Sequence, residues 1–117
     1  MQFSSSLKEN HLFRRLYRKG KSAANATLAV YCRPNGTARS RVGLTVSGKL
    51  GGAVQRNRLR RRLREIYRLH EGLFTPGWDL VVVARSRAME ASYAELEQAY
   101  LSLAQKLGLC RSEEVPT

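Results

Sequence analysis

The stretch that decides the fold is AVQRNRLRRRLREIYRLH, residues 53–70, which follows a Gly-Gly pair. Its apolar positions recur at steps of three and four residues, a spacing that places them on one face of a helix. These positions are Leu59, Leu63, Ile66, Tyr67 and His70. The segment therefore predicts an amphipathic helix that packs one face against the rest of the protein.

The side of this predicted helix that faces away from the apolar positions carries a basic stripe. The stripe consists of Arg56, Asn57, Arg60, Arg61, Arg64 and Arg68. Guanidinium groups match phosphate oxygens in a fork geometry, and an asparagine offers a donor and an acceptor to a sugar or base edge. Only Glu65 could neutralise its neighbours, and closely spaced cations repel one another. The stripe therefore favours a phosphate-backbone site over a solvated charged face.

The residues before this helix predict one more helix and two strands. Residues 10–19 have apolar positions at helical spacing between a capping Asn10 and Gly20. Residues 27–33 and 41–47 alternate between apolar and other residues, as strands do. Because turn-forming Pro34-Asn35-Gly36 lies between the two strands, we expect them to pair as an antiparallel hairpin.

The residues after the long helix predict a buried strand and a last helix. Residues 79–84, DLVVVA, form a continuous apolar run that suits a central strand buried on both faces. Ser92 can cap a helix that ends at Gly108. The sequence thus predicts an α+β sandwich of order α-β-β-α-β-α, one small mixed sheet packed against helices. We expect a single domain over residues 1–110 and a flexible tail over residues 111–117.

The charge of the chain indicates a polyanionic partner. Its 117 residues include 21 Lys and Arg against nine Asp and Glu, a formal net charge of +12. The first 70 residues hold 17 of the basic and only two of the acidic side chains. Because the basic residues are interleaved with apolar ones, they belong to a folded surface rather than a disordered tail. Nucleic acid is the leading candidate.

Other classes of site find little support in the sequence. Cys32 and Cys110 lack the spacing of a metal site or of a disulfide framework. The two histidines, His11 and His70, have no recognisable catalytic partners, so we predict no catalytic and no metal-binding residues. No apolar run is long enough for a membrane span or a signal peptide, which predicts a cytoplasmic protein without a membrane partner.

Three aromatic residues form a second candidate surface. Phe13 and Tyr17 lie one helical turn apart, and Tyr31 faces opposite to Val30 and Cys32 on its strand. Aromatic rings beside a basic groove can stack the bases of a single strand, at roughly 1 to 3 kcal/mol per base. Phe and Tyr also fill protein cores, and the sequence leaves both interpretations open.

Three motifs contain or precede the basic stripe: RVGLTVS at residues 41–47, GGAVQRNR at residues 51–58, and the pairs Arg60-Arg61 and Arg64-Glu65. Together they resemble bacterial ribonuclease P protein subunits, and the Arg-Asn-Arg ("RNR") part is the specific one. The similarity extends over about residues 7–107, nearly the whole chain. It also implies a left-handed βαβ crossover, which the general right-handed rule would not suggest.

The resemblance implies a noncatalytic subunit of an endoribonuclease. Such a subunit joins a large catalytic RNA and helps it to remove the 5′ leader from precursor tRNA, while the RNA performs the phosphodiester chemistry. The implied partners are therefore ribonuclease P RNA and precursor tRNA, with no obligate protein partner. Magnesium would be held mainly by the RNA subunit and the substrate, and none by the protein alone.

The resemblance also implies roles for individual residues. Phe13, Tyr17 and Tyr31 would line a cleft for the single-stranded leader. The RNR helix and its flank would contact the catalytic RNA through Arg56, Asn57, Arg58, Arg60, Arg61, Arg64, Arg68 and Lys49.

The chain departs from the family pattern at two glycines. Family members commonly have a lysine pair after the position of Ser47 and an asparagine before the Ala-Val step, where this chain has Gly48-Lys49 and Gly52. Lys49 can retain part of the role of the pair.

Three other functions remain open on the sequence alone. The main alternative is a ribosomal or ribosome-associated protein that binds rRNA, because a basic stripe suits that role equally well. A membrane or acidic protein partner is less favoured, because the apolar face of the helix is needed to cover the sheet. Sequence-specific DNA recognition is the least favoured, since no helix-turn-helix or dimerisation pattern accompanies the arginines.

Overall fold

The structure is a computed structural model that describes residues 4–6 and 10–110. Side-chain surroundings are described for residue 14 and residues 16–110. The predicted tail, residues 111–117, lies outside the described residues, so the predicted division into one domain and a tail stays a prediction.

Among the described residues, one mixed sheet of five strands forms the middle of the molecule, in the order β1-β4-β5-β3-β2. Its strands are β1 (Ser4–Ser6), β2 (Lys21–Ala24), β3 (Leu28–Pro34), β4 (Ser40–Thr45) and β5 (Trp78–Ala84). β5 pairs parallel with β4 and antiparallel with β3, and its residues Leu80, Val81 and Val82 are almost wholly buried. The prediction of a central strand buried on both faces is therefore confirmed.

The prediction that residues 27–33 and 41–47 pair as a hairpin is wrong, because the corresponding strands, β3 and β4, do not pair. β5 lies between them, with Val82 opposite Val30 on one side and opposite Leu44 on the other. A strand that is apolar on both faces gains most from the centre of a sheet, where both of its edges also find partners. Asn35 in the connecting turn favours this arrangement, since its Nδ2 donates to Asp79 Oδ1 at the start of β5, 3.0 Å away.

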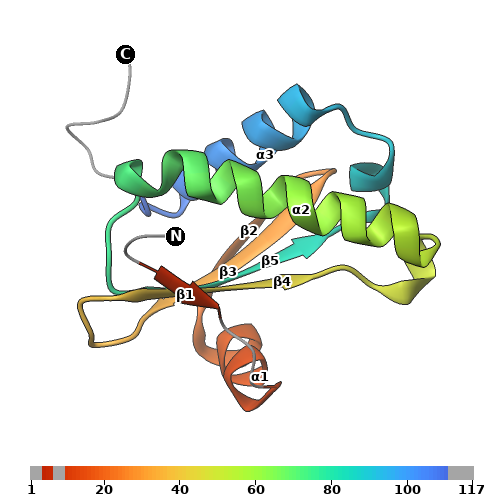
Figure 1. Cartoon of the computed structure of the whole chain (residues 1–117). Coiled ribbons are helices and arrows are strands. Elements are labelled where there is room, and N and C mark those ends of the chain that lie inside the picture. Colours follow the sequence, from red (N-terminus) through yellow and green to blue (C-terminus); the bar gives the residue numbers. More distant parts are fainter. Residues whose placement is uncertain (1–3, 7–9, 111–117) are drawn as a thin grey trace.

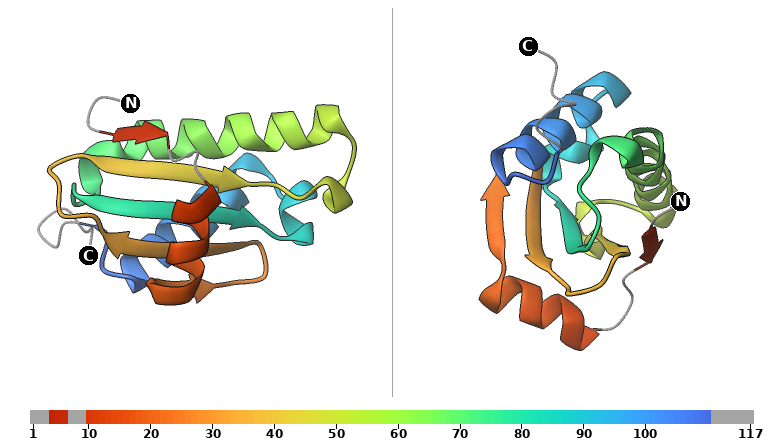
Figure 2. Two further views of the ribbon diagram at one scale, coloured as in Figure 1. Left: turned by 90° about the horizontal axis from the view of Figure 1, so that it is seen from below. Right: turned by 90° about the vertical axis from the view of Figure 1, so that its left-hand side faces the viewer.

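In the described part of the chain, three α-helices lie on the two faces of the sheet (Figures 1 and 2). They are α1 (Asn10–Lys19), α2 (Ala53–His70) and α3 (Tyr93–Lys106). Short 3₁₀ turns lie at Gly48–Leu50 (η1), Glu71–Leu73 (η2) and Ser86–Met89 (η3). α2 and α3 cover one face and enclose the main core, whereas α1 packs on the other face against β3 and β5. The α+β class is confirmed, although the sequence prediction lacked β1 and β2.

The last helix is capped as its sequence predicts. The Ser92 side chain accepts a hydrogen bond from the Glu95 N–H, and the Glu95 side chain accepts one from the Ser92 N–H. This reciprocal pair satisfies two of the N–H groups that a helix start leaves without partners. Gly108, with φ of +75°, follows the helix in the left-handed conformation that glycine adopts without strain.

α2 connects the parallel strands β4 and β5 by a left-handed crossover. In Figure 1, β4 runs to the right, α2 returns above the sheet, and β5 runs to the right again behind β4. With the helix toward the viewer and the strands pointing up, β5 thus lies to the left of β4, and Figure 2 shows the same relation from below. The expectation of a left-handed βαβ unit is confirmed, against the usual right-handed preference.

Candidate nucleic-acid interface

The rotation of α2 about its axis is set by its apolar face. Leu59, Leu63, Ile66 and Tyr67 are all buried, as their spacing predicts. His70 is half-buried at the end of the same face, where its Nε2 lies 2.8 Å from Glu97 Oε2 on α3. Because this face is anchored at both ends, the remaining surface of α2 presents its side chains outward in a defined order.

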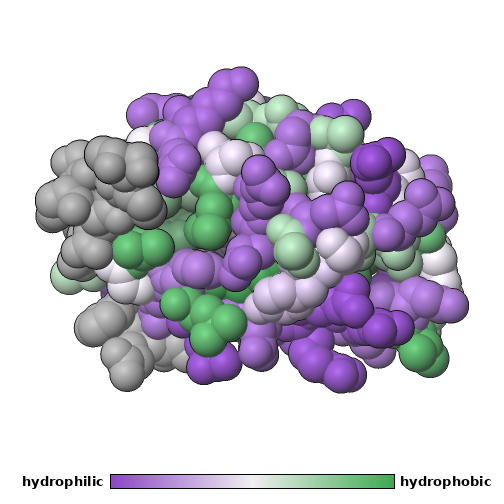
Figure 3. All heavy atoms as spheres, turned by 90° about the horizontal axis from the view of Figure 1, so that it is seen from above, coloured by the Kyte–Doolittle hydropathy of each residue, from purple (hydrophilic) through white to green (hydrophobic). Residues whose placement is uncertain are grey.

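The outermost row of α2 consists of exposed polar side chains: Asn57, Arg61, Arg64 and Arg68. Arg68 Nη2 lies 3.5 Å from Glu65 Oε1, a solvent-exposed pair that stabilises little. Arg61 and Arg64 have no hydrogen-bond or ion-pair partner among the described residues. Hydrophilic side chains accordingly dominate the part of the surface over α2 in Figure 3. Within this row, Arg61 and Arg64 are therefore free to meet a phosphate backbone.

A second row lies between α2 and the end of β4. Arg56 and Arg60 are half-buried rather than solvent-facing, which corrects the prediction that they belong to the fully outward side. Arg60 Nη1 donates to Asn57 Oδ1 at 2.9 Å, and its Nη2 lies 3.4 Å from the Val46 carbonyl oxygen. Arg56 Nε donates to the Gly51 carbonyl at 3.1 Å. These bonds hold both guanidinium groups in place before any ligand arrives, which lowers the entropy lost on binding.

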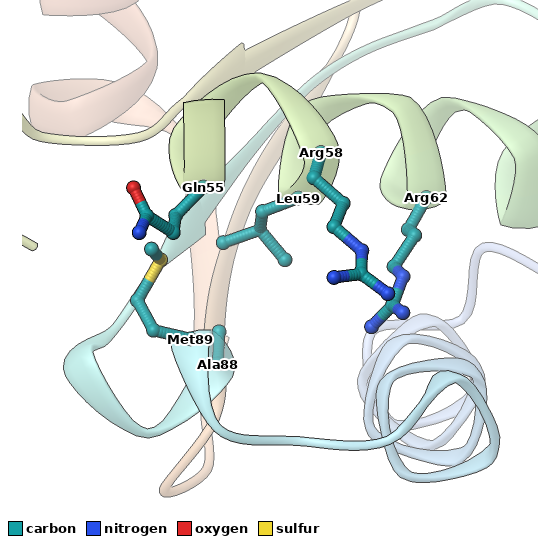
Figure 4. Close-up of a pocket in the computed structure, with 6 residues that line it drawn as sticks. All are labelled: Gln55, Arg58, Leu59, Arg62, Ala88 and Met89. Carbon is teal, nitrogen blue, oxygen red and sulfur yellow. The ribbon is translucent and has the colours of Figure 1, made fainter. Parts of the chain in front are cut away.

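Arg58 lies on the other flank of α2, together with Arg62 (Figure 4). Both side chains border a pocket between α2 and η3, so the structure separates Arg58 from the remainder of the RNR motif. Arg62 was not among the predicted site residues, although it lies four residues after Arg58 and therefore on the same flank. That spacing was the signal that could have found it.

Lys49 and the two departures from the family pattern lie just before α2. Lys49 is exposed in η1, and its N–H donates to Ser47 Oγ at 3.2 Å. A Cβ on Gly48 would lie 3.9 Å from Arg56 Nη1, so this glycine is close to the second row. A Cβ on Gly52 would come within 2.7 Å of Gln55 Oε1, a contact that a change in the Gln55 side chain could relieve. Lys49 thus supplies a cation on the 3₁₀ turn η1, which contacts α2.

On the opposite face of the sheet, Tyr17 of α1 and Tyr31 of β3 meet. Their ring centroids are 4.8 Å apart at an interplanar angle of 77°, an edge-to-face contact. Tyr17 is 42% exposed, whereas Tyr31 is half-buried beside Leu16 and Val81. Phe13 lies one turn earlier on α1, but its side chain is not among those described. Tyr17 therefore presents ring surface to solvent, while Tyr31 both packs and supports it.

A row of charged side chains that was not predicted from the sequence lies on this same face. Arg33, Asp79 and Arg41 lie opposite one another on β3, β5 and β4. Asp79 is buried and accepts two hydrogen bonds from Arg41, with Nε at 2.8 Å and Nη2 at 2.6 Å. Arg33 Nη1 is buried without a hydrogen-bond partner. The row places Arg33 two positions from Tyr31 on the same face of β3, whereas Arg41 is paired with Asp79. Only the strand order, which the sequence did not reveal, brings the three side chains together.

Within the described part of the chain, no three His, Cys, Asp or Glu side chains gather as metal ligands, and no helix is long and apolar enough to cross a membrane. Cys32 is buried and Cys110 half-buried, and burial raises the pKa of both thiols above the ordinary value. A raised pKa keeps a thiol protonated and unreactive near neutral pH.

The fold and this surface define a small basic α+β protein equipped for a polyanionic partner, with cations along a helix in a left-handed crossover. Comparison with known proteins then identifies the family. The chain belongs to the ribonuclease P protein family, whose model, described as "Ribonuclease P", matches residues 1–108.

Individual relatives agree with this assignment. The "Ribonuclease P protein component" of Alkaliphilus metalliredigens is 42% identical over 109 residues, which cover 93% of this chain and 98% of the relative. The protein of the same name from Alkaliphilus oremlandii is 43% identical over 112 residues, 96% of this chain and 98% of the relative.

Solved structures of the family share the fold. The RNase P protein of Staphylococcus aureus superimposes with a TM-score of 0.84 at 31% identity, covering 91% of this chain and 97% of that one. The RNase P protein of Thermotoga maritima gives a TM-score of 0.80 at 32% identity, covering 86% and 96%. The resemblance inferred from the motifs is thereby confirmed.

Proposed function

We propose that this protein is the noncatalytic subunit of a ribonuclease P, which binds the catalytic RNA through α2 and the single-stranded leader of precursor tRNA through the α1 face. The observation that carries the proposal is the set of arginine rows on α2, whose position is imposed by a buried apolar face. Cations held in this way can follow a phosphate backbone at little entropic cost.

The assignment of the catalytic RNA to α2 and of the leader to the α1 face follows from the side chains on each surface. The outermost arginines of α2 reach phosphates without reading bases, which suits a large folded RNA. The α1 face instead offers the exposed ring of Tyr17 beside Tyr31, with Arg33 two positions further along the same face of β3. Aromatic rings next to cations suit a short single strand with little sequence preference.

The chemical step is assigned to the RNA partner. The protein would contribute by binding the catalytic RNA and the leader, so that the cleavage site and the bound magnesium ions come together. Magnesium would be held by the RNA and the substrate rather than by side chains of this chain. The cytoplasmic location predicted from the sequence stays a prediction.

Leader binding is tested by Tyr31→Ala in a holoenzyme reconstituted with a bacterial ribonuclease P RNA. Loss of the ring removes stacking or shape on the α1 face, worth roughly 1 to 3 kcal/mol. We expect the affinity for precursor tRNA with a leader to fall by about tenfold, and the affinity for mature tRNA to stay nearly unchanged. Equilibrium binding of the two labelled tRNAs provides the measurement.

Two further variants make the result specific. Tyr31→Phe keeps the ring and should retain most of the leader affinity. Tyr93→Ala removes a tyrosine from α3, on the far side of the sheet, and should not distinguish the two tRNAs. Equal losses for precursor and mature tRNA in Tyr31→Ala would refute the leader assignment.

A further inference from the structure

A pocket lies on the α3 side of α2, away from Arg56 and Arg60. We call it the α2–η3 pocket; it is open on one side and has a volume of about 140 Å³. It is lined by Gln55, Arg58, Leu59, Arg62, Ala88 and Met89. Figure 4 shows the two arginines descending from successive turns of α2 toward the space beside η3, with Leu59 between Gln55 and Arg58.

One side of this pocket is lined by apolar side chains that are packed into the protein. Leu59 and Ala88 are buried at 4% and 2% exposure, and Met89 is half-buried. The Met89 methyl group lies only 3.0 Å from the point where a Cβ on Gly51 would stand, so the glycine leaves the room that this side chain occupies. A thioether and aliphatic carbons offer a polarisable surface on which an aromatic ring can rest.

The other side of the pocket is cationic. No acidic side chain lines it, and Arg58 and Arg62 have no hydrogen-bond or ion-pair partner among the described residues. Like charges four residues apart on a helix repel each other. An anion placed between the two guanidinium groups would relieve that repulsion and accept a two-pronged hydrogen bond from each. The pocket is therefore electrostatically suited to an anionic ligand.

The combination of the two sides narrows the ligand class. An inorganic anion would not use the Leu59–Met89 surface, and an apolar ligand would leave two guanidinium groups without partners. A nucleotide satisfies both, since its base is a flat ring and its phosphate is an anion. The Gln55 amide adds a donor and an acceptor that can meet the edge of a base.

We propose that the α2–η3 pocket binds one unstacked nucleotide of the RNA partner, with its base against Leu59 and Met89 and its phosphate between Arg58 and Arg62. Sequence-specific recognition of RNA largely uses bases that are splayed out of the helix, which stack on side chains, including the plane of an Arg guanidinium, and form hydrogen bonds through their edges. The RNA source rests on the function proposed above, whereas the nucleotide chemistry rests on the pocket alone.

The first experiment tests the nucleotide chemistry without any RNA. The full chain, labelled with ¹³C at its methionine methyl groups, is titrated with AMP and, separately, with adenosine and inorganic phosphate. We expect the Met89 methyl resonance to shift with AMP because of the ring current of the base. AMP should bind about tenfold more tightly than either fragment, because it alone uses both sides of the pocket.

Paired variants distinguish the pocket from general attraction to a basic protein. Arg62→Gln should weaken AMP binding by about tenfold, to the level of adenosine. Arg87→Gln removes the same charge from an exposed position of η3 outside the lining, and should leave AMP binding unchanged. An unmoved Met89 resonance, equal binding of phosphate and AMP, or equal losses in the two variants would overturn the proposal.

The second experiment identifies the source of the nucleotide. Binding of a bacterial ribonuclease P RNA is measured for the same two variants at fixed salt. A loss in Arg62→Gln that clearly exceeds the loss in Arg87→Gln supports an RNA nucleotide as the occupant. Equal losses, together with specific AMP binding, would overturn that source in favour of a free nucleotide. If the unaltered protein binds no such RNA, the proposed function fails, while the AMP result still decides the chemistry of the pocket.

Discussion

Arg60 and Arg61 are adjacent in the chain but lie in different surroundings. Arg60 is half-buried and is held by Asn57 and the Val46 carbonyl, whereas Arg61 is exposed and has no partner among the described residues. A positively charged side chain that the protein already holds contributes to folding as well as to binding. The two residues therefore allow the two contributions to be separated.

We predict that Arg61→Ala weakens RNA binding without loss of stability. Removal of one phosphate contact should reduce the slope of log affinity against log salt by about 0.7 to 0.9, and the melting temperature should stay the same. Arg60→Ala should reduce the slope similarly and also lower the melting temperature by a few degrees, since about 1 kcal/mol of hydrogen bonding is lost. Binding titrations at several salt concentrations and thermal melts provide the data.

These two residues also show what a sequence can reveal at this scale. The helical period correctly separated the buried side of α2 from its basic side. It could not show that Arg56 and Arg60 lean over the end of β4, because their partners, Gly51 and Val46, are set by tertiary structure.

An unchanged salt slope in Arg61→Ala would show that the outermost row does not contact phosphate.

At the scale of elements, the position of α1 depends on Gly20, which follows the helix and lies very close to the backbone of β3. A Cβ on Gly20 would lie 2.7 Å from both the Cys32 and the Leu16 carbonyl oxygens. Both contacts are with backbone, which cannot move aside as a flexible side chain can. The same helix carries Tyr17 to its contact with Tyr31, so the close approach positions the aromatic pair.

We predict that Gly20→Ala displaces α1 from the sheet. The unfolding free energy should fall by about 1 to 3 kcal/mol, as for other overpacked sites. Affinity for the precursor tRNA leader should fall as well, because Tyr17 moves with the helix. Gly72→Ala is the matched control, since nothing lies within 4 Å of a Cβ there, and it should change stability by less than about 0.5 kcal/mol. Denaturant melts of both variants provide the comparison.

The start of α3 predicts a pH dependence of stability. Hydrogen bonds from Ser92, first from its backbone N–H, lower the pKa of Glu95 below its ordinary value of 4.5. Because the folded pKa lies below the unfolded one, this carboxylate stabilises the fold above pH 4.5, and the contribution is lost as the pH falls through the lowered value. Glu95→Gln should therefore flatten the fall in melting temperature between about pH 5 and pH 3.

Glu90→Gln is the control for this effect, since Glu90 is an exposed carboxylate just before the same helix and no part of its cap. If the melting temperature of Glu95→Gln falls with pH as steeply as that of the unaltered protein, the role of the cap is contradicted.

This cap was predictable because Ser-x-x-Glu is a local pattern. The separation of β3 from β4 was not predictable, since it depends on β5, which lies between them in the sheet and begins more than thirty residues after β4 ends.

At the scale of the whole molecule, the sheet separates two surfaces of different chemistry. One side presents the arginine rows of α2, and the other presents α1 with its tyrosine and the cations of β3 and β4. The class of fold and the family could be recognised from the sequence, because the RNR motif and the amphipathic helix are local. The edge strands β1 and β2 could not, since a run of serines and the segment Lys21–Ala24 lack an alternating apolar pattern.

The central claim is that this protein assists a catalytic RNA, and reconstitution tests it most directly. The purified protein is added to a bacterial ribonuclease P RNA at low magnesium, and release of the 5′ leader from precursor tRNA is followed over time. We predict that the protein stimulates cleavage by the RNA and that the protein alone cleaves nothing. Absence of stimulation with a cognate RNA would contradict the claim and would favour the rRNA-binding alternative.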